Sequence, residues 1–341
     1  METVFPPPEI SISQAMEAYL KGLSLARSAN TARTYHNGIE MFKATLIDQK
    51  LDPDTTDVKK LSEDLIVYFT TALKEHSPAT ERLYITAVTG FYEYLEAQAL
   101  TSVNLPRLRL LIRQRARRPG IRLPQFPRDA IDEVLAYASR LASHPAEDEN
   151  ARLRNLRDKA FLITLADTGL RVHEACNLRR GDLDWNEGRA IIIGKGNKQA
   201  VVRFSQRAQA AIQQYLSARA PLDGASGRPL SAQPLFARHD KGTGKKVKPI
   251  TTATGRNIVA ARVKEALGSQ AAGSITPHSF RHYFVTRVLL ASGNLKLAQE
   301  LARHQNIAVT TRYAHLSDDE LDKGYWNVFE DSKDDLVTGE Q

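Results

Sequence analysis

The chain has 341 residues, 42% hydrophobic and 25% charged, which is typical of a globular protein with room for two domains. No run of about 18 apolar residues occurs, so we expect no membrane span and no membrane partner. The first residues lack the basic and apolar regions of a signal peptide. The single cysteine, Cys176, excludes an intrachain disulfide and favours a reducing cytoplasm as the location.

The formal net charge is +8, and it is distributed unevenly. From Asp318 to the C-terminus there are nine acidic and two basic residues, so the body of the chain is more basic than the total indicates. A basic body with an acidic end indicates a polyanionic partner, with nucleic acid first. Charge alone leaves open a basic surface that only maintains solubility.

Residues 10–100 are predicted to be all helical. Apolar residues at helical spacing predict helices over 11–27, 30–47, 61–76 and 77–99. Asn30 and Ser77 are the expected N-caps, with Pro78 at a first helical position. The aromatic side chains of the fourth helix are interpreted as core rather than as base-stacking groups.

Residues 105–128 mark the clearest boundary, with eight arginines, four prolines and no acidic residue. The prolines predict an extended linker, and the uniform positive charge predicts contact with a phosphate backbone rather than an inert tether. The expected DNA-binding residues of this segment are Arg107, Arg109, Arg113, Arg115, Arg117 and Arg118.

A second domain is predicted from about Pro127. Helices are expected over 128–142, 151–169, 171–178, 205–219 and 251–268, and a final amphipathic helix over 317–329. Two β-rich runs, 189–194 and 200–204, predict a hairpin with a lysine-bearing turn. The fold class is therefore mainly α with a small β-hairpin or sheet (α+β). A second basic cluster, Lys241, Lys245, Lys246 and Lys248, is expected to contact DNA, with a solvated loop as the alternative.

The stretch from His278 to Tyr313 carries the groups that phosphodiester chemistry needs. His278 and Arg281 are three residues apart after Pro277, so both should project from one face of a helix's first turn. Arginine binds two phosphate oxygens at once, and tyrosine can attack phosphorus if cations or a base help it ionise from its ordinary pKa of about 10. Histidine can serve as that base. No acidic cluster in the sequence indicates a bound Mg²⁺.

Five motifs occur in order: TGLRVHE at 168–174, GKGNK at 194–198, HSFRH at 278–282, ARH at 302–304, and TTRYAHLS at 310–317. Their order and spacing resemble the tyrosine recombinases, also called the phage integrase family. The resemblance covers the C-terminal domain, and the helical unit before it looks like the core-binding domain of that family.

The resemblance implies a role for each matching position. Arg171 and Arg281 would clamp the scissile phosphate, His278 would assist the tyrosine proton, and His304 would hydrogen-bond the phosphate. Glu174 matches a carboxylate that supports the site.

The remaining two roles concern the leaving group and the nucleophile. Lys195 would protonate the 5′-hydroxyl leaving group, with Lys198 in the same turn as the competitor for this role. Tyr313 would be the nucleophile that forms a 3′-phosphotyrosyl link. The family needs neither a metal nor ATP, so no cofactor is expected.

Two departures from the family pattern are visible. Arg303 stands where glycine usually precedes the second histidine, and His173 replaces a small residue. Neither change removes a catalytic group. His282 and His315 are interpreted as structural or backbone-contacting rather than catalytic, and Cys176 as buried and inert.

Together these features predict a site-specific DNA recombinase or integrase, of the simple-site or Xer-like kind. Its expected organisation is a core-binding domain (1–104), an arginine-rich linker (105–126), a catalytic domain (127–330) and an acidic tail (331–341). It would act on double-stranded DNA as a homotetramer across two sites, alone or with a partner recombinase. Its expected location is the cytoplasm, and the nucleoid if the source is bacterial. A type IB-like topoisomerase and a non-catalytic DNA-binding protein on a recombinase scaffold remain alternatives.

Overall fold

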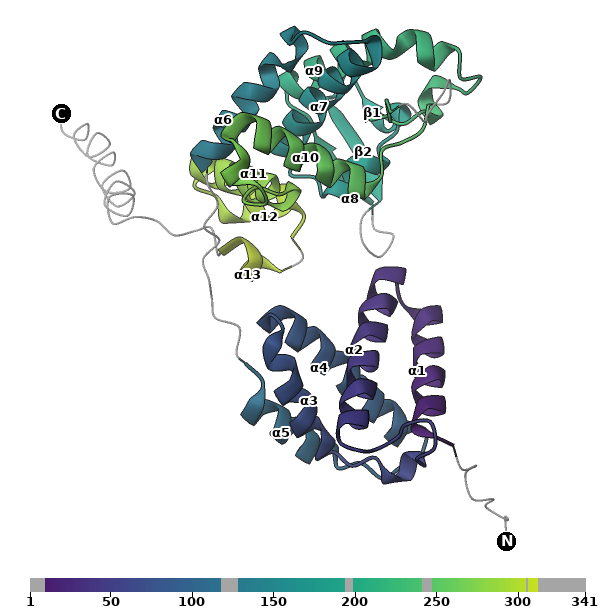
Figure 1. Cartoon of the computed structure of the whole chain (residues 1–341). Coiled ribbons are helices and arrows are strands. Elements are labelled where there is room, and N and C mark those ends of the chain that lie inside the picture. Colours follow the sequence, from purple (N-terminus) through teal and green to yellow (C-terminus); the bar gives the residue numbers. More distant parts are fainter. Residues whose placement is uncertain (1–9, 118–127, 194–198, 241–246, 305, 312–341) are drawn as a thin grey trace, which may run out of the picture. The chain divides into compact units, whose positions relative to one another are not determined.

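The computed structural model describes residues 10–117, 128–193, 199–240, 247–304 and 306–311 (Figure 1). These residues are mostly helical, with a small antiparallel sheet of three strands, so the predicted fold class is confirmed. The chain divides into two compact units, Met1–Ile121 and Arg122–Gln341. Within the described segments, no helix is both long and apolar enough to cross a bilayer.

The first unit is helical throughout its described part. Its elements are α1 (Ile12–Ala26), α2 (Ala29–Asp48), α3 (Leu65–Ala72), α4 (Pro78–Ala97) and α5 (Leu105–Arg115), with 3₁₀ turns at Val58–Lys60 and Leu73–Glu75. Phe42 meets Phe69 edge to face, with ring centroids 5.2 Å apart, and Phe91 and Tyr92 of α4 are fully buried beside them. The aromatic residues of α4 therefore belong to the core, as predicted.

Serine side chains begin three of these helices. Ser11, Ser28 and Ser77 each accept a hydrogen bond from a backbone N–H in the first turn of the helix that follows. The prediction of Asn30 as the cap of α2 is wrong, because that helix begins two residues earlier than its apolar pattern indicates and Ser28 caps it. Ser77 and Pro78 begin α4 as predicted.

The prediction of an extended linker is wrong for residues 105–115, which form α5. Pro106 lies in the first turn, where a backbone N–H has no acceptor within the helix, so the proline breaks no hydrogen bond. The Asn104 side chain caps this turn by accepting from the Arg107 N–H at 2.9 Å. Leu108 is fully buried in the core of the first unit, and α5 packs against α3 and α4.

Several arginines of this segment already have carboxylate partners. The ion pairs are Arg107–Asp64 (2.6 Å), Arg109–Glu93 (2.8 Å) and Arg117–Glu81. The first two pairs are solvent-exposed and therefore weak, so a phosphate can compete with them. Arg113 and Arg115 lie in the last turn of α5, and Arg118 lies outside the described residues. DNA contact by this set stays a prediction.

The second unit contains eight described helices and the sheet. The helices are α6 (Arg128–Arg140), α7 (Glu149–Thr168), α8 (Val172–Asn177), α9 (Gln206–Gly224), α10 (Thr252–Leu267), α11 (Pro277–Ser292), α12 (Leu295–Ala302) and α13 (Ile307–Thr310). Short 3₁₀ turns are found at Leu141–Ser143, Arg180–Asp182, Leu230–Ala232 and Ser269–Ala271.

The sheet has the order β1 (Leu183–Asp184), β2 (Arg189–Ile193), β3 (Gln199–Arg203), and both pairs are antiparallel. The predicted hairpin is therefore confirmed, with Ile191 paired to Val201. Alternate residues of β2 are buried, as expected for a sheet with one covered face. Lys195 and Lys198 belong to residues 194–198, outside the described part.

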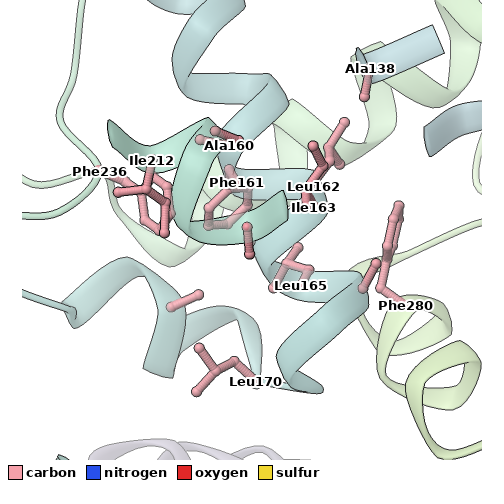
Figure 2. Close-up of a cluster of buried hydrophobic side chains, with 14 of the residues drawn as sticks. Ala138, Ala160, Phe161, Leu162, Ile163, Leu165, Leu170, Ile212, Phe236 and Phe280 are labelled. Carbon is pink, nitrogen blue, oxygen red and sulfur yellow. The ribbon is translucent and has the colours of Figure 1, made fainter. Parts of the chain in front are cut away.

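Helix α7 is the centre of the second unit. It packs against α6, α8, α9 and α11, and its residues 160–166 are all buried (Figure 2). Phe161 meets Phe236 edge to face at 5.2 Å, and Phe280 of α11 joins the same cluster. Burial of this kind fixes α8 and α11 relative to one another, because both rest on one rigid helix.

A polar cluster lies buried beside this core. The His239 ring is 2.7 Å from the Tyr215 hydroxyl, which also accepts from Arg219 at 3.0 Å. Arg219 is fully buried and pairs with Asp223 at 2.9 Å. Burial, together with the nearby cations Arg157, Arg219 and Arg154, lowers the pKa of His239 to about 3. The imidazole is therefore neutral in the folded protein at neutral pH.

Replacing His239 with glutamine should flatten the acid dependence of stability. Between about pH 6.5 and pH 3 the unfolded chain binds a proton that the folded chain does not, so the free energy of unfolding falls as pH falls, by on the order of 1 kcal/mol per pH unit. Urea unfolding at about pH 7, 5.5 and 4 measures this slope. His36→Gln, exposed on α2, is the matched control for the substitution itself. If the free energy of unfolding of His239→Gln falls with pH as steeply as that of wild type, His239 is not the source of the acid dependence.

Candidate active site

Three of the predicted site residues line one cavity of about 480 Å³ in the second unit. Arg171 comes from the start of α8, and His278 and Arg281 come from the first turns of α11. Arg256 and Asn257 of α10 also line this cavity, and no sequence signal beyond a helical pattern marked them. The fold thus joins segments more than a hundred residues apart in the chain.

A glycine turn places Arg171. Helix α7 ends at Gly169, whose φ of +59° lies in the left-handed region that favours glycine. A Cβ at this position would lie 2.4 Å from the Phe284 ring of α11, so the close packing of α11 also requires glycine. Leu170 is fully buried, and Arg171 follows as the N-cap residue of α8. The predicted helix end at Gly169 is confirmed.

Glu174 organises the cationic side of the cavity. Its carboxylate accepts the Arg171 backbone N–H at 2.9 Å and the Arg171 guanidinium at 2.9 Å. Arg303 donates to the same carboxylate at 3.0 Å. Burial alone would raise the pKa of Glu174, but the Arg171 N–H and the two guanidinium groups hold it below its ordinary value. The side chain is therefore a buried carboxylate anion shared by two arginines.

Arg281 is almost completely buried and connects three helix ends. Its guanidinium donates to the Gly169 carbonyl at the end of α7 and to the Ala302 carbonyl at the end of α12. Burial and the neighbouring charges of Arg171 and Arg303 lower the pKa of Arg281 to about 9, so it stays charged at neutral pH. The orphan carbonyls of two helices thus orient this cation.

Three histidines surround these arginines, and burial lowers the pKa of each. His278 follows Pro277 in the first turn of α11, and its ring centroid is 4.2 Å from that of His282. His304 follows α12, and its Nδ1 is 2.9 Å from the Thr310 hydroxyl of α13. Burial and the arginines Arg281 and Arg171 lower the pKa of His304 to about 4. Neutral rings can accept a proton or donate a hydrogen bond at neutral pH.

The pKa values of the other two rings have partly different causes. Burial, with the charges of Arg281 and Arg171, lowers the pKa of His278. Burial and the neighbouring His278 and His304 lower the pKa of His282 to about 4. The sequence interpretation of His282 as a structural residue stays a prediction, although its ring contacts a site histidine.

Arg303 is the residue that the sequence marked only as a departure from a pattern. It ends α12 in the left-handed conformation, with φ of +57°, and its side chain is 12% exposed. Its place directly before His304 is the one sequence signal that points to the site. The other departure, His173, is exposed and lines a separate depression between α8 and the strands.

Several predicted residues lie outside the described part of the chain: Lys195, Lys198, Lys241, Lys245, Lys246 and Tyr313. The prediction that Cys176 is buried and inert agrees with its 1% exposure and with burial raising its pKa to about 12. No group of three or more His, Cys, Asp or Glu side chains suited to a metal ion occurs among the described residues.

The charge of the site indicates an anionic ligand. Arg171, Arg281 and Arg303 lie around the single carboxylate of Glu174, and Arg256 lines the same cavity. Such an excess of fixed guanidinium groups, partly removed from water, suits a phosphodiester and the extra charge that develops on it during attack.

Residues 138–320, more than half of the chain, match the phage integrase family. The chain belongs to this family. Tyrosine recombinase XerC of Staphylococcus saprophyticus is 27% identical over 320 residues, which cover 93% of this chain and 97% of that protein. The family resemblance predicted from the motifs is confirmed.

Solved structures with the same fold extend over both units. The Tn1549 transposon integrase in complex with transposon right end DNA has a TM-score of 0.65 at 17% identity, covering 94% of this chain and all of that one. The XerH site-specific recombinase bound to difH substrate has a TM-score of 0.64 at 18% identity, covering 93% of this chain and 84% of that one.

Replacing Arg281 with lysine should destabilise this phage integrase family member. Lysine keeps the charge but cannot direct two N–H groups at the Gly169 and Ala302 carbonyls, so at least one buried carbonyl loses its partner. We expect a loss of about 1–3 kcal/mol in the free energy of unfolding, measured by urea denaturation. Arg287→Lys, exposed on the same helix, is the control. Equal stability of the two variants would contradict the structural role of Arg281.

Proposed function

We propose that this phage integrase family protein is a site-specific DNA recombinase that cleaves and rejoins DNA through a 3′-phosphotyrosyl intermediate. The observation that carries the proposal is the cavity that Arg171, His278 and Arg281 line together, next to Glu174. A phosphodiester bound there would accept hydrogen bonds from two planar guanidinium forks, one of them rigidly held by main-chain carbonyls.

The chemistry is a pair of phosphoryl transfers. The Tyr313 oxygen attacks the phosphorus, the new O–P bond forms, and the P–O5′ bond breaks. Lys195 gives its proton to the departing 5′-oxygen, and His278, neutral at physiological pH, assists removal of the phenol proton. The 5′-hydroxyl of another strand then reverses these steps, so the bond energy is conserved without an external energy source.

The two compact units support a division of labour. Residues 1–104 form a core-binding domain, residues 105–126 the arginine-rich connection, residues 127–330 the catalytic domain and residues 331–341 an acidic tail. Helix α5 packs on the first unit, so the first part of the arginine-rich segment belongs to that unit. Both domains contact double-stranded DNA in this proposal, and the Lys241, Lys245 and Lys246 cluster adds a phosphate contact.

Strand exchange between two DNA sites requires more than one subunit. We propose a homotetramer, alone or with a partner recombinase, that acts in the cytoplasm. The relatives whose names state a DNA complex, XerH on difH and the Tn1549 integrase on a transposon end, support a recombination site as the substrate.

Tyr313→Phe should abolish covalent adduct formation with a nicked suicide DNA substrate, because phenylalanine lacks the attacking oxygen. Wild type should form a denaturant-resistant protein–DNA adduct, and the variant should bind the same DNA with unchanged affinity. The adduct is measured on a denaturing gel, and binding by fluorescence anisotropy at a stated salt concentration.

Three outcomes would contradict the proposal. An adduct in Tyr313→Phe means that another residue is the nucleophile. No adduct in wild type, on fragments enriched by its own sequence-specific binding, favours the non-catalytic DNA-binding alternative. Relaxation of supercoiled plasmid by monomer without strand exchange favours the type IB-like topoisomerase.

Lys195→Ala should slow cleavage of ordinary DNA by roughly a hundredfold or more, because the 5′-oxygen then leaves without its proton. A substrate with sulfur at the 5′-bridging position needs no such proton, so it should restore the cleavage rate of the variant. Lys198→Ala is the matched control from the same turn. If Lys198→Ala is the slow variant and the sulfur substrate restores its cleavage rate, then Lys198 is the general acid.

A further inference from the structure

Arg303 adopts a backbone conformation that is unfavourable for its own side chain. It ends α12 with φ of +57° and ψ of +45°, the left-handed region in which residues with a Cβ lose about 1 kcal/mol relative to glycine. Glycine would therefore be the residue that suits the turn. The presence of arginine indicates that its side chain contributes something that compensates for the backbone.

The contact that this side chain makes is with Glu174, 129 residues earlier in the chain. Arg303 Nη2 donates to Glu174 Oε2 at 3.0 Å, while Arg171 Nη1 donates to Oε1 at 2.9 Å. The Arg303 side chain is 12% exposed and that of Arg171 is 41% exposed. One buried carboxylate thus has an inner arginine and an outer arginine, and only the outer one lines the phosphate cavity.

Two further nitrogens of the inner arginine, Nε and Nη1, are buried and have no hydrogen-bond partner among the described residues. A guanidinium that only stabilised the fold would be expected to satisfy its donors as Arg281 does with main-chain carbonyls. The incomplete pairing of Arg303 is unfavourable by itself, which again indicates a role in the site rather than in stability.

We propose that Arg303 is a positioning residue for strand cleavage, acting through Glu174 on Arg171. Arg303 takes up part of the carboxylate charge, so Glu174 orients the Arg171 guanidinium without neutralising it. Arg171, the outer arginine, then has free N–H donors and an uncompensated positive charge with which to bind the scissile phosphate. This inference rests on the proposed recombinase function.

The electrostatic consequence follows from counting charges. With Arg303 present, Arg171, Arg281 and Arg303 outnumber Glu174 by two charges; without it the excess is one, and Glu174 pairs with Arg171 alone. Burial and the charges of Arg171 and Arg303 lower the pKa of Arg281, which agrees with three cations held close together. Such crowding is unfavourable until an anion enters, so it strengthens phosphate binding in the transition state.

The deciding variant is Arg303→Gly, because the backbone favours glycine at this position. We expect thermal unfolding close to that of wild type and single-turnover cleavage of the suicide substrate slowed by about tenfold to a hundredfold. Arg303→Lys keeps the charge and should recover part of the rate. Lys50→Gly is the matched control: Lys50 also has a left-handed backbone, with φ of +61°, and also loses a positive charge, but lies exposed in the first unit.

A double-mutant cycle tests the route through Glu174. In a Glu174→Gln background the carboxylate charge is absent, so Arg303→Gly should change the cleavage rate by less than about threefold. Equal losses in both backgrounds would overturn the route, because Arg303 would then act without Glu174.

The remaining outcomes separate this inference from the proposed function. A wild-type rate in Arg303→Gly overturns the inference while leaving the recombinase proposal intact. Absence of cleavage by wild type overturns the recombinase proposal itself. If Arg303→Gly does not fold, Arg303→Gln carries the test, because glutamine removes the positive charge but keeps a polar side chain. A wild-type cleavage rate in Arg303→Gln would overturn the inference.

Discussion

The guanidinium of Arg281 is the interaction on which the candidate site depends. It sits in the first turns of α11 and donates to the last carbonyls of α7 and α12, so one buried cation connects three helix ends. Helix α8, which begins with Arg171, follows α7 through the Gly169 turn, and His304 follows α12. Arg281 holds the ends of both α7 and α12, so it helps to position both Arg171 and His304. Because α7 packs against α6, α8, α9 and α11, the fold itself holds these helix ends in place, without help from a ligand.

The second constraint is charge. Several guanidinium groups repel one another when they are removed from water, and Glu174 offsets only part of that repulsion. The histidines respond to the same field, since burial and these cations keep their rings neutral. A phosphate entering the cavity would find donors already oriented and a local excess of positive charge. In this phage integrase family member, the mutual repulsion of the arginines is unfavourable by itself but prepares the site for an anion.

Helix patterns, the hairpin and the motif set were predictable because each depends on local spacing. Ser77 and Pro78 begin α4, Gly169 ends α7, and the β2–β3 pair forms where two short runs of β-branched residues follow one another in the chain. The extended linker was predicted wrongly because composition does not show that Leu108 finds a buried place on the first unit, which stabilises α5 despite Pro106. The apolar repeat that marks α2 predicts Asn30 as its cap, but Ser28, which lies outside that repeat, caps the helix.

The sequence by itself determined the family, the fold class and the chemical types available, because motif order and hydrophobic period are properties of the chain. Only the tertiary structure decided how those groups are charged and paired. The sequence predicts Arg281 as a phosphate ligand but does not show that main-chain carbonyls already hold its guanidinium. It marks Arg303 only as a departure from the family pattern, but the Arg303 side chain shares a buried carboxylate with Arg171. These facts depend on contacts across more than a hundred residues and on removal from water, neither of which local sequence encodes.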